Sequence, residues 1–167
     1  MGVHEHKAGT PTRVGCVVIT CSDTRTSETD TSGALMCRLL REHGHDVLGS
    51  HIIKDDPALI VASVRDAARQ DGVQAILING GTGISRRDST FEAVDRLLEK
   101  RLDGFGELFR ALSYQEIGSS AMMSRATAGI YQGRVVFSTP GSENAVRLAM
   151  EKLILPELGH LIKELTK

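Results

Sequence analysis

The feature that most constrains the fold is an abrupt change from apolar to glycine-rich sequence near the middle of the chain. Residues 73–78 form a short run rich in β-branched side chains, as buried parallel strands do. The run stops at Asn79, and Gly80, Gly81, Thr82 and Gly83 follow. Ser89 stands three residues before Glu92, which is the spacing of a capping box. The stretch therefore predicts a strand, a glycine turn and a helix that begins at about Ser89.

A turn of this kind suits an anionic ligand. Glycine adopts positive φ and lets a ligand approach the backbone, and the free N–H groups of turns and helix starts attract negative charge. Arg86 or Arg87 can add a planar guanidinium for phosphate oxygens. Asp88 would repel the ligand unless a cation lies between them, so it suggests Mg²⁺ or a role in proton transfer. The structural alternative is a tight connection that binds nothing.

Two further strands are predicted before this turn, over residues 13–20 and 47–53, which are apolar and β-branched. The first is followed by a polar loop that contains Ser22, Asp23 and Arg25, and then by an apolar helical face over residues 34–40. The second is followed by Asp55, Asp56 and Pro57. Asp56 and Pro57 are typical of the N-cap and N1 positions of a helix, so Asp55 is expected to remain exposed at the strand end.

In the C-terminal half, residues 103–106 contain two glycines and predict a break, with a helix following from about 107 to 117. Arg96, Lys100 and Arg101, on or just after the helix that follows the glycine turn, are interpreted as a solvated face. The pair Met122 and Met123 is interpreted as core or subunit contact.

Two short β-prone runs, 126–131 and 134–138, are separated by Gln132 and Gly133, which predicts a hairpin with a primed turn. A second junction of strand, glycine and helix follows at Pro140, Gly141 and Ser142, where Ser142 can cap the last helix. Pro156 either kinks that helix or starts another.

This order of elements predicts a three-layer α/β/α fold with a mostly parallel sheet and an antiparallel hairpin near the C-terminal end. The length of 167 residues fits one domain, over residues 13–167, after a flexible tail of residues 1–12. His4 and His6 in that tail are expected to be solvated rather than to bind a metal.

Composition excludes several classes of partner. The 20 basic and 21 acidic residues nearly balance, and only 4% of residues are aromatic, so we expect no nucleic-acid partner. No apolar run is long enough to span a bilayer and the N-terminus does not have the core of a signal peptide, so we expect no membrane and a cytoplasmic protein. The three cysteines, Cys16, Cys21 and Cys37, have no zinc-type spacing and are expected to be reduced.

Four polar segments follow the predicted strands, and parallel strands bring their carboxyl ends to one edge of a sheet. Two acids at separate strand ends, with backbone donors and arginines between them, suit Mg²⁺-assisted phosphoryl or nucleotidyl transfer. The glycine turn matches neither the P-loop nor the dinucleotide-binding pattern. The four segments are Ser22 to Arg25, Asp55, Gly80 to Asp88, and Pro140 to Ser142.

The ordered motifs resemble those of the MoaB/Mog family of molybdopterin-binding proteins in molybdenum cofactor biosynthesis. The resemblance covers about residues 14–158 and rests on several short segments in the family's order. They are Asp30-Thr31-Ser32-Gly33, Asp55-Asp56, Asn79-Gly80-Gly81-Thr82-Gly83, Arg87-Asp88-Ser89-Thr90, Glu92-Ala93, Gly104-Phe105-Gly106-Glu107, Ser124-Arg125 and Pro140-Gly141-Ser142.

The resemblance implies a molybdopterin adenylyltransferase that uses ATP and Mg²⁺ and releases pyrophosphate. It implies that Asp55 and Asp88 are the catalytic acids and place the metal, and that the glycine turn and Ser142 hold the terminal phosphate of the pterin. The substrate-binding residues expected on this basis are Ser22, Asp23, Gly80, Gly81, Thr82, Gly83, Arg87, Ser124, Pro140, Gly141 and Ser142. It further implies a homo-oligomer, either trimer or hexamer, and the molybdate-inserting enzyme of the pathway as a partner.

Two departures from the Mog pattern favour the MoaB branch. Lys54 precedes Asp55 where Mog proteins often have proline, and Ser142 and Glu143 follow Gly141 in place of the usual Asn-Pro. Glu143 is expected to face solvent in the first turn of a helix, where an acid suits the dipole. The alternative to catalysis is an oligomer that binds or scaffolds molybdopterin without adenylylating it.

Overall fold

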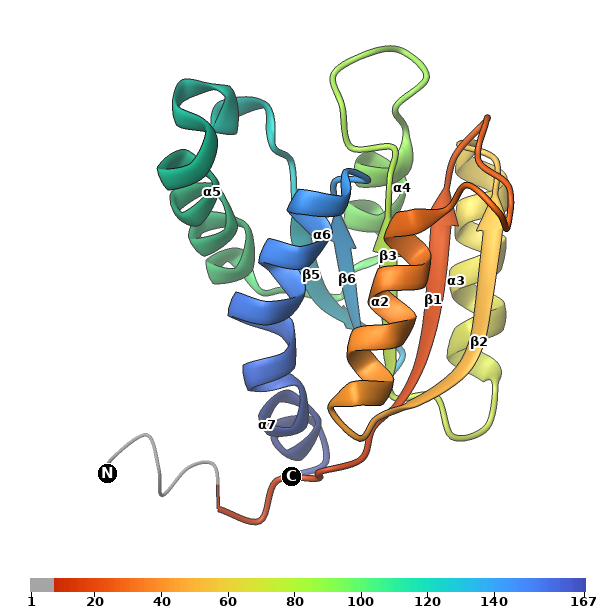
Figure 1. Cartoon of the computed structure of the whole chain (residues 1–167). Coiled ribbons are helices and arrows are strands. Elements are labelled where there is room, and N and C mark those ends of the chain that lie inside the picture. Colours follow the sequence, from red (N-terminus) through yellow and green to blue (C-terminus); the bar gives the residue numbers. More distant parts are fainter. Residues whose placement is uncertain (1–7) are drawn as a thin grey trace.

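Six strands form a single sheet in the computed structural model, which describes residues 8–167 (Figure 1). The strands are β1 (Gly15–Cys21), β2 (Asp46–Ile53), β3 (Ala75–Asn79), β4 (Lys100–Arg101), β5 (Thr127–Tyr131) and β6 (Arg134–Thr139). Their order in the sheet is β2-β1-β3-β6-β5-β4. The pairs β1/β2, β1/β3 and β3/β6 are parallel, and β5 is antiparallel to both β6 and β4.

Helices cover both faces of the sheet. They are α2 (Thr31–Glu42), α3 (Pro57–Arg69), α4 (Thr90–Leu97), α5 (Asp103–Ile117), the 3₁₀ segment η1 (Gly118–Met123), α6 (Glu143–Ala149), the π-helical turn η2 (Met150–Ile154) and α7 (Leu155–Leu165). One apolar core joins α2, α5, α6 and α7 to the sheet, and a second joins α3 and α4 to the opposite face. The predicted three-layer α/β/α fold, mostly parallel with a C-terminal hairpin, is confirmed.

The β1 strand shows why the sheet is central. All seven of its residues are buried, and alternate side chains point to opposite faces, as the pleat of a strand requires. Cys16 and Val18 pack in the core under α2, whereas Val17 and Ile19 pack in the core under α3. A strand with both faces covered needs a continuous apolar run, which is the pattern that predicted it.

Local signals fixed several junctions. Gln132 and Gly133 both have positive φ, 46° and 73°, in the tight turn between β5 and β6, as a primed hairpin turn requires. The Ser142 side chain accepts a hydrogen bond from the N–H of Ala145 and caps α6, as predicted. Pro156 lies in the first turn of α7, after the π-helical turn that joins it to α6.

One prediction in the region between α4 and α5 is wrong. Residues 103–106 are not a break, because α5 begins at Asp103. Gly106 instead lets this helix approach β5, since a Cβ there would lie 2.6 Å from the carbonyl oxygen of Ala126. Arg96 in α4, and Lys100 and Arg101 just after it, are exposed, as expected, and the last two form the short edge strand β4.

Residues 1–7 lie outside the described part of the chain, and with them most of the predicted tail and both of its histidines. Residues 8–12 run beside α7, where Lys163 Nζ donates to the carbonyl of Ala8 at 2.5 Å. Within residues 8–167, no helix combines the length and apolarity that crossing a bilayer requires.

Capping of α3 provides a test of local stability. Asp56 Oδ1 accepts hydrogen bonds from the N–H groups of Ala58 (2.9 Å) and Leu59 (3.2 Å), so Asp56→Ala should lower the free energy of unfolding by about 1 kcal/mol. Asp66→Ala, at an exposed position inside the same helix, should be neutral or slightly stabilising. Urea denaturation of both variants measures the difference, and equal stabilities would contradict the capping assignment.

Candidate functional site

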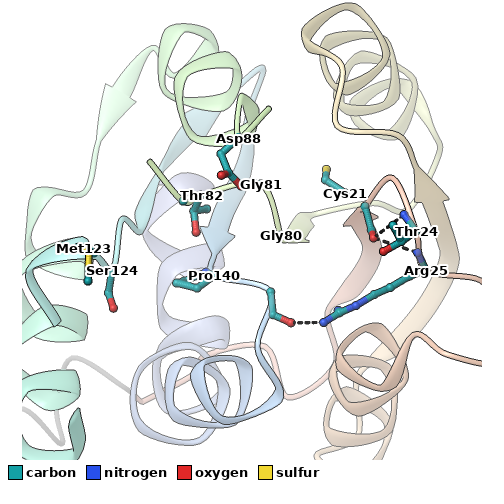
Figure 2. A pocket seen from close by; sticks show the side chains of 13 residues that line it. Cys21, Thr24, Arg25, Gly80, Gly81, Thr82, Asp88, Met123, Ser124 and Pro140 are labelled. Carbon is teal, nitrogen blue, oxygen red and sulfur yellow. Dashed lines mark hydrogen bonds between the residues drawn. The ribbon is translucent and has the colours of Figure 1, made fainter. Parts of the chain in front are cut away.

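A cavity of about 460 Å³ opens at the carboxyl edge of the sheet, where β1, β3 and β6 end. Connections from the central strands β1 and β3 leave on opposite faces there, and open α/β sheets bind ligands at such a point. Figure 2 shows the side chains arranged around the opening. The lining residues are Cys21, Ser22, Thr24, Arg25, Gly80, Gly81, Thr82, Gly83, Asp88, Met123, Ser124, Pro140 and Gly141.

The glycine turn forms one wall of this cavity in a backbone conformation that other residues resist. Gly80 and Gly81 have φ values of 99° and 62°. A Cβ on Gly80 would overlap with the carbonyl oxygen of Cys21, and one on Gly81 would overlap with the side chains of Thr90 and Asp55. Both glycines are therefore required by the packing as well as by φ.

The turn also leaves backbone donors free. Among the described residues, none accepts a hydrogen bond from the N–H groups of four consecutive residues, which are Gly81, Thr82, Gly83 and Ile84. Successive free amides in a turn create a concave region of positive potential. An anionic group in the cavity would supply the acceptors that these amides do not have.

Arg25 provides the positive side chain of the lining. Its guanidinium reaches across to the opposite wall, where Nη2 donates to the carbonyl of Gly141 at 2.9 Å (Figure 2). Nη1 lies 3.6 Å from Oδ1 of the buried Asp30. The Ser22 hydroxyl accepts from the N–H of Arg25 at 3.0 Å and so fixes the loop that carries it. Arg25 is thus held in place and keeps donors for a ligand.

Asp88 is the acid that lines the cavity, as predicted. It is half-buried, and its Oδ2 accepts hydrogen bonds from the hydroxyl of Ser85 at 2.5 Å and from the N–H of Ser85 at 3.2 Å. The same carboxylate lies against Gly83, where an added Cβ would come within 2.6 Å of Oδ2. Asp88 is therefore held against the wall that carries the free amides.

Asp55 differs from its prediction, because it is buried and not exposed, with 7% of its surface accessible. Its Oδ1 accepts from Ser89 N (3.1 Å), Ser89 Oγ (2.7 Å) and Thr90 Oγ1 (3.3 Å). Asp55 is not part of the cavity lining. Its Oδ2 lies against Gly81, from behind the glycine turn, and accepts no hydrogen bond from the described residues.

These bonds also correct the expected capping box. The α4 helix does begin just after Ser89, but the Ser89 side chain makes no capping bond. Its hydroxyl is used by Asp55, and Glu92 pairs with Arg125. The spacing located the helix start, whereas tertiary partners decided where the side chains point.

Asp23 and Arg87, both expected to bind substrate, bind each other outside the cavity lining. Arg87 donates to Asp23 Oδ2 from Nε (3.1 Å) and Nη2 (2.7 Å). This guanidinium, more than any other group, holds the pKa of Asp23 below its usual value. Asp23 Oδ1 also accepts from the N–H of Asp55 at 3.2 Å, so the pair joins the loop after β1 to the glycine turn and to the end of β2.

The other predicted residues divide between the lining and its surroundings. Ser124, Pro140 and Gly141 line the cavity, while Ser142 is exposed as the cap of α6 and does not. Glu143 is exposed in the first turn of α6, as expected. Thr24 lies within the predicted segment Ser22 to Arg25, whereas Cys21 and Met123 were not predicted as lining residues.

Met122 and Met123 are 78% and 51% exposed, so of the two interpretations, core or subunit contact, only subunit contact fits their position. Cys21 is a lining residue, and burial raises the pKa of its thiol to about 12, which disfavours the reactive thiolate. As expected, Cys16, Cys21 and Cys37 are free thiols.

The fold and this cavity define an α/β protein with a cavity at the carboxyl edge of its parallel sheet, one wall of which presents unpaired backbone amides. Residues 17–160 match the model of a family described as "Probable molybdopterin binding domain". The chain belongs to this family, and within it to the group of molybdenum cofactor biosynthesis protein B, the MoaB branch.

Individual relatives support this assignment. The chain is 54% identical to molybdenum cofactor biosynthesis protein B of Bacillus subtilis over 100% of this chain and 99% of that protein. A crystal structure of a molybdenum cofactor biosynthesis protein B, 56% identical, superimposes with a TM-score of 0.91 and covers 93% of this chain and 98% of the other. The tungsten cofactor synthesizing protein MoaB of Pyrococcus furiosus, 38% identical, gives a TM-score of 0.84 with coverage of 94% and 99%.

The glycine turn can be tested by adding one methyl group. Gly81→Ala places a Cβ at a positive φ and in the space of Thr90 and Asp55, so the free energy of unfolding should fall by about 2 kcal/mol or more. Gly104→Ala is the matched control, because a Cβ there has no neighbour within 4 Å and φ is not positive. The control should be neutral or stabilised by up to about 1 kcal/mol. Thermal and urea denaturation compare them, and a harmless Gly81→Ala would disprove the tight packing.

Proposed function

We propose that this protein binds molybdopterin in the cavity at the carboxyl edge and adenylylates it with Mg-ATP, releasing pyrophosphate. The observation that carries the proposal is the meeting of four free amides, Arg25 and Asp88 around one cavity. Membership of the molybdopterin-binding family supports the pterin as the ligand. A volume of about 460 Å³ falls within the range of small-molecule sites.

The phosphate end of the pterin would lie against the glycine turn. Backbone N–H groups bind phosphate oxygens without a mobile side chain, so little ordering is needed when the ligand arrives. Arg25, held by the Gly141 carbonyl and Asp30, would donate to the same oxygens from the other wall. Arg87 was expected in this role, but its pairing with Asp23 leaves Arg25 as the better candidate.

The residues fit a magnesium ion that arrives with the nucleotide. In residues 8–167, no group of three or more His, Cys, Asp or Glu side chains is arranged to hold a metal by itself. Mg²⁺ is commonly bound by one or two carboxylates together with substrate phosphates, so such a cluster is not required. Asp88 would hold the ion from the lining, and the free Oδ2 of Asp55 is the second carboxylate oxygen nearest the turn. When bound, Mg²⁺ neutralises phosphate charge and orients the transferred group.

Asp55 has a further role in this proposal, through the residues that it holds. Its Oδ1 fixes Ser89 and Thr90, the residues that follow Asp88, and its Oδ2 lies behind Gly81. Asp55 therefore sets the position of both the acid and the amides relative to the strand ends. Such positioning is a large part of catalysis in phosphoryl and nucleotidyl transfer.

The second candidate is an oligomer that binds molybdopterin without chemistry. It is favoured by one observation, that Asp88 is the single carboxylate of the lining while Asp55 is engaged behind the turn. Tight pterin binding that ATP does not change, with no adenylylated product, would establish this candidate and exclude the first.

Exposed apolar side chains support an assembly in either case. Leu108, Tyr114 and Ile117 on α5, with Met122 and Met123 in η1, are all more than half exposed. An exposed group of large apolar side chains is typical of a protein contact. We include a homo-oligomer, trimer or hexamer, in the proposal on this basis.

The acid of the lining gives the direct test of catalysis. Incubation of the protein with molybdopterin and Mg-ATP should release pyrophosphate, and Asp88→Asn should reduce the rate by about 100-fold or more, because it removes a charge that places the metal. The matched control is Asp71→Asn, an exposed aspartate just after α3. Coupled detection of pyrophosphate measures all three rates, and full activity of Asp88→Asn would exclude the proposed role.

A further inference from the structure

Arg125 holds the glycine turn from outside the cavity lining. Its guanidinium donates from Nε to the carbonyl of Thr82 at 2.9 Å and from Nη2 to the carbonyl of Gly83 at 2.6 Å. These are two successive peptide groups of the turn. Arg125 follows η1 and precedes β5, so a segment more than 40 residues away along the chain fixes the turn.

Because the peptide bond is planar, these two contacts also set the direction of the neighbouring backbone N–H groups. In a trans peptide the C=O of one residue and the N–H of the next point in opposite directions. A carbonyl of Thr82 aimed at Arg125 therefore aims the N–H of Gly83 away from it, and the carbonyl of Gly83 does the same for the N–H of Ile84. These are two of the four amides that no described residue accepts from.

The charge of Arg125 is already balanced, which separates its role from that of Arg25. Glu92 in α4 forms an ion pair with Arg125, and this guanidinium is the main reason that the pKa of Glu92 lies below its usual value. The guanidinium carbon also lies 4.8 Å from the centre of the Phe91 ring, a cation–π contact. Arg125 thus pairs with Glu92, stacks on Phe91 and does not line the cavity. Its Nε and Nη2 groups donate to the turn.

We propose that Arg125 is a positioning residue, which presents the N–H groups of Gly83 and Ile84 to the anionic end of the ligand. The inference rests on the proposed function in that the ligand has a phosphate group. The affinity for the phosphate group then depends on a guanidinium that does not contact the phosphate. A lysine cannot replace the fork, because one ammonium group does not hold two successive carbonyls in a fixed plane.

The test compares two arginine-to-lysine variants of the full-length protein. Arg125→Lys retains the charge and loses the fork. Arg101→Lys is the matched control, since Arg101 makes a similar two-bond contact to Asp95 (2.9 and 2.7 Å) and neither residue lines the cavity. Inorganic pyrophosphate is the probe of anion binding, and molybdopterin binding is measured in parallel. We expect Arg125→Lys to bind pyrophosphate about tenfold or more weakly and Arg101→Lys to match the unaltered protein.

Amide NMR separates positioning from general stability. In ¹⁵N-labelled protein without substitutions, pyrophosphate should shift the amide resonances of Gly83 and Ile84, and in Arg125→Lys these shifts should be lost while thermal stability matches Arg101→Lys. Unshifted amides in the unaltered protein would overturn the inference even if Arg125→Lys does not fold. If the unaltered protein binds molybdopterin but the two amide resonances do not shift, the positioning role is overturned and the proposed function stands. If the protein binds neither molybdopterin nor pyrophosphate, the proposed function itself is overturned.

Discussion

The site depends on the close approach of four chain segments at Gly80 and Gly81. The carbonyl of Cys21 at the end of β1, the carboxylate of Asp55 after β2 and the hydroxyl of Thr90 at the start of α4 all occupy space that a Cβ would need. Because no side chain separates these segments, the loops after β1, β2 and β3 pack against each other directly. The cavity is the space left on the open side of this contact, between the glycine turn, Arg25 and the loop at Gly141.

Three arginines near this contact have different tasks, and their partners distinguish them. Arg25 is tied to a backbone carbonyl and a buried aspartate and still lines the cavity. Arg87 is exposed and paired with Asp23, an arrangement that contributes little stability in water. Arg125 is paired, stacked and bound to the turn. Spacing along the chain cannot distinguish these tasks, because each depends on a carboxylate or carbonyl from a distant segment.

The fold was largely predictable because its signals are local. Apolar β-branched runs located the central strands, Asp56 with Pro57 located a helix start, and Gln132 with Gly133 located the hairpin. The order of these elements implied a shared carboxyl edge, which brought Ser22, the glycine turn, Asp88 and Gly141 into one site. Where the predictions failed, a tertiary contact decided the outcome. Asp55 is buried where Ser89 and Thr90 donate to it, and Gly106 lies inside a helix at a point where a Cβ would come too close to the carbonyl of Ala126.

A wall made of backbone amides has a consequence for how substitutions are tolerated. The donors of residues 82 and 84 belong to the main chain, so any side chain that leaves the turn intact also leaves the donors in place. The substitutions that would disturb the donors are therefore those at residues that shape the turn, such as Gly81, Asp55 and Arg125. A mutational scan of this protein would then identify the residues that support the turn, and it would give little signal for the amides that we propose bind the anion.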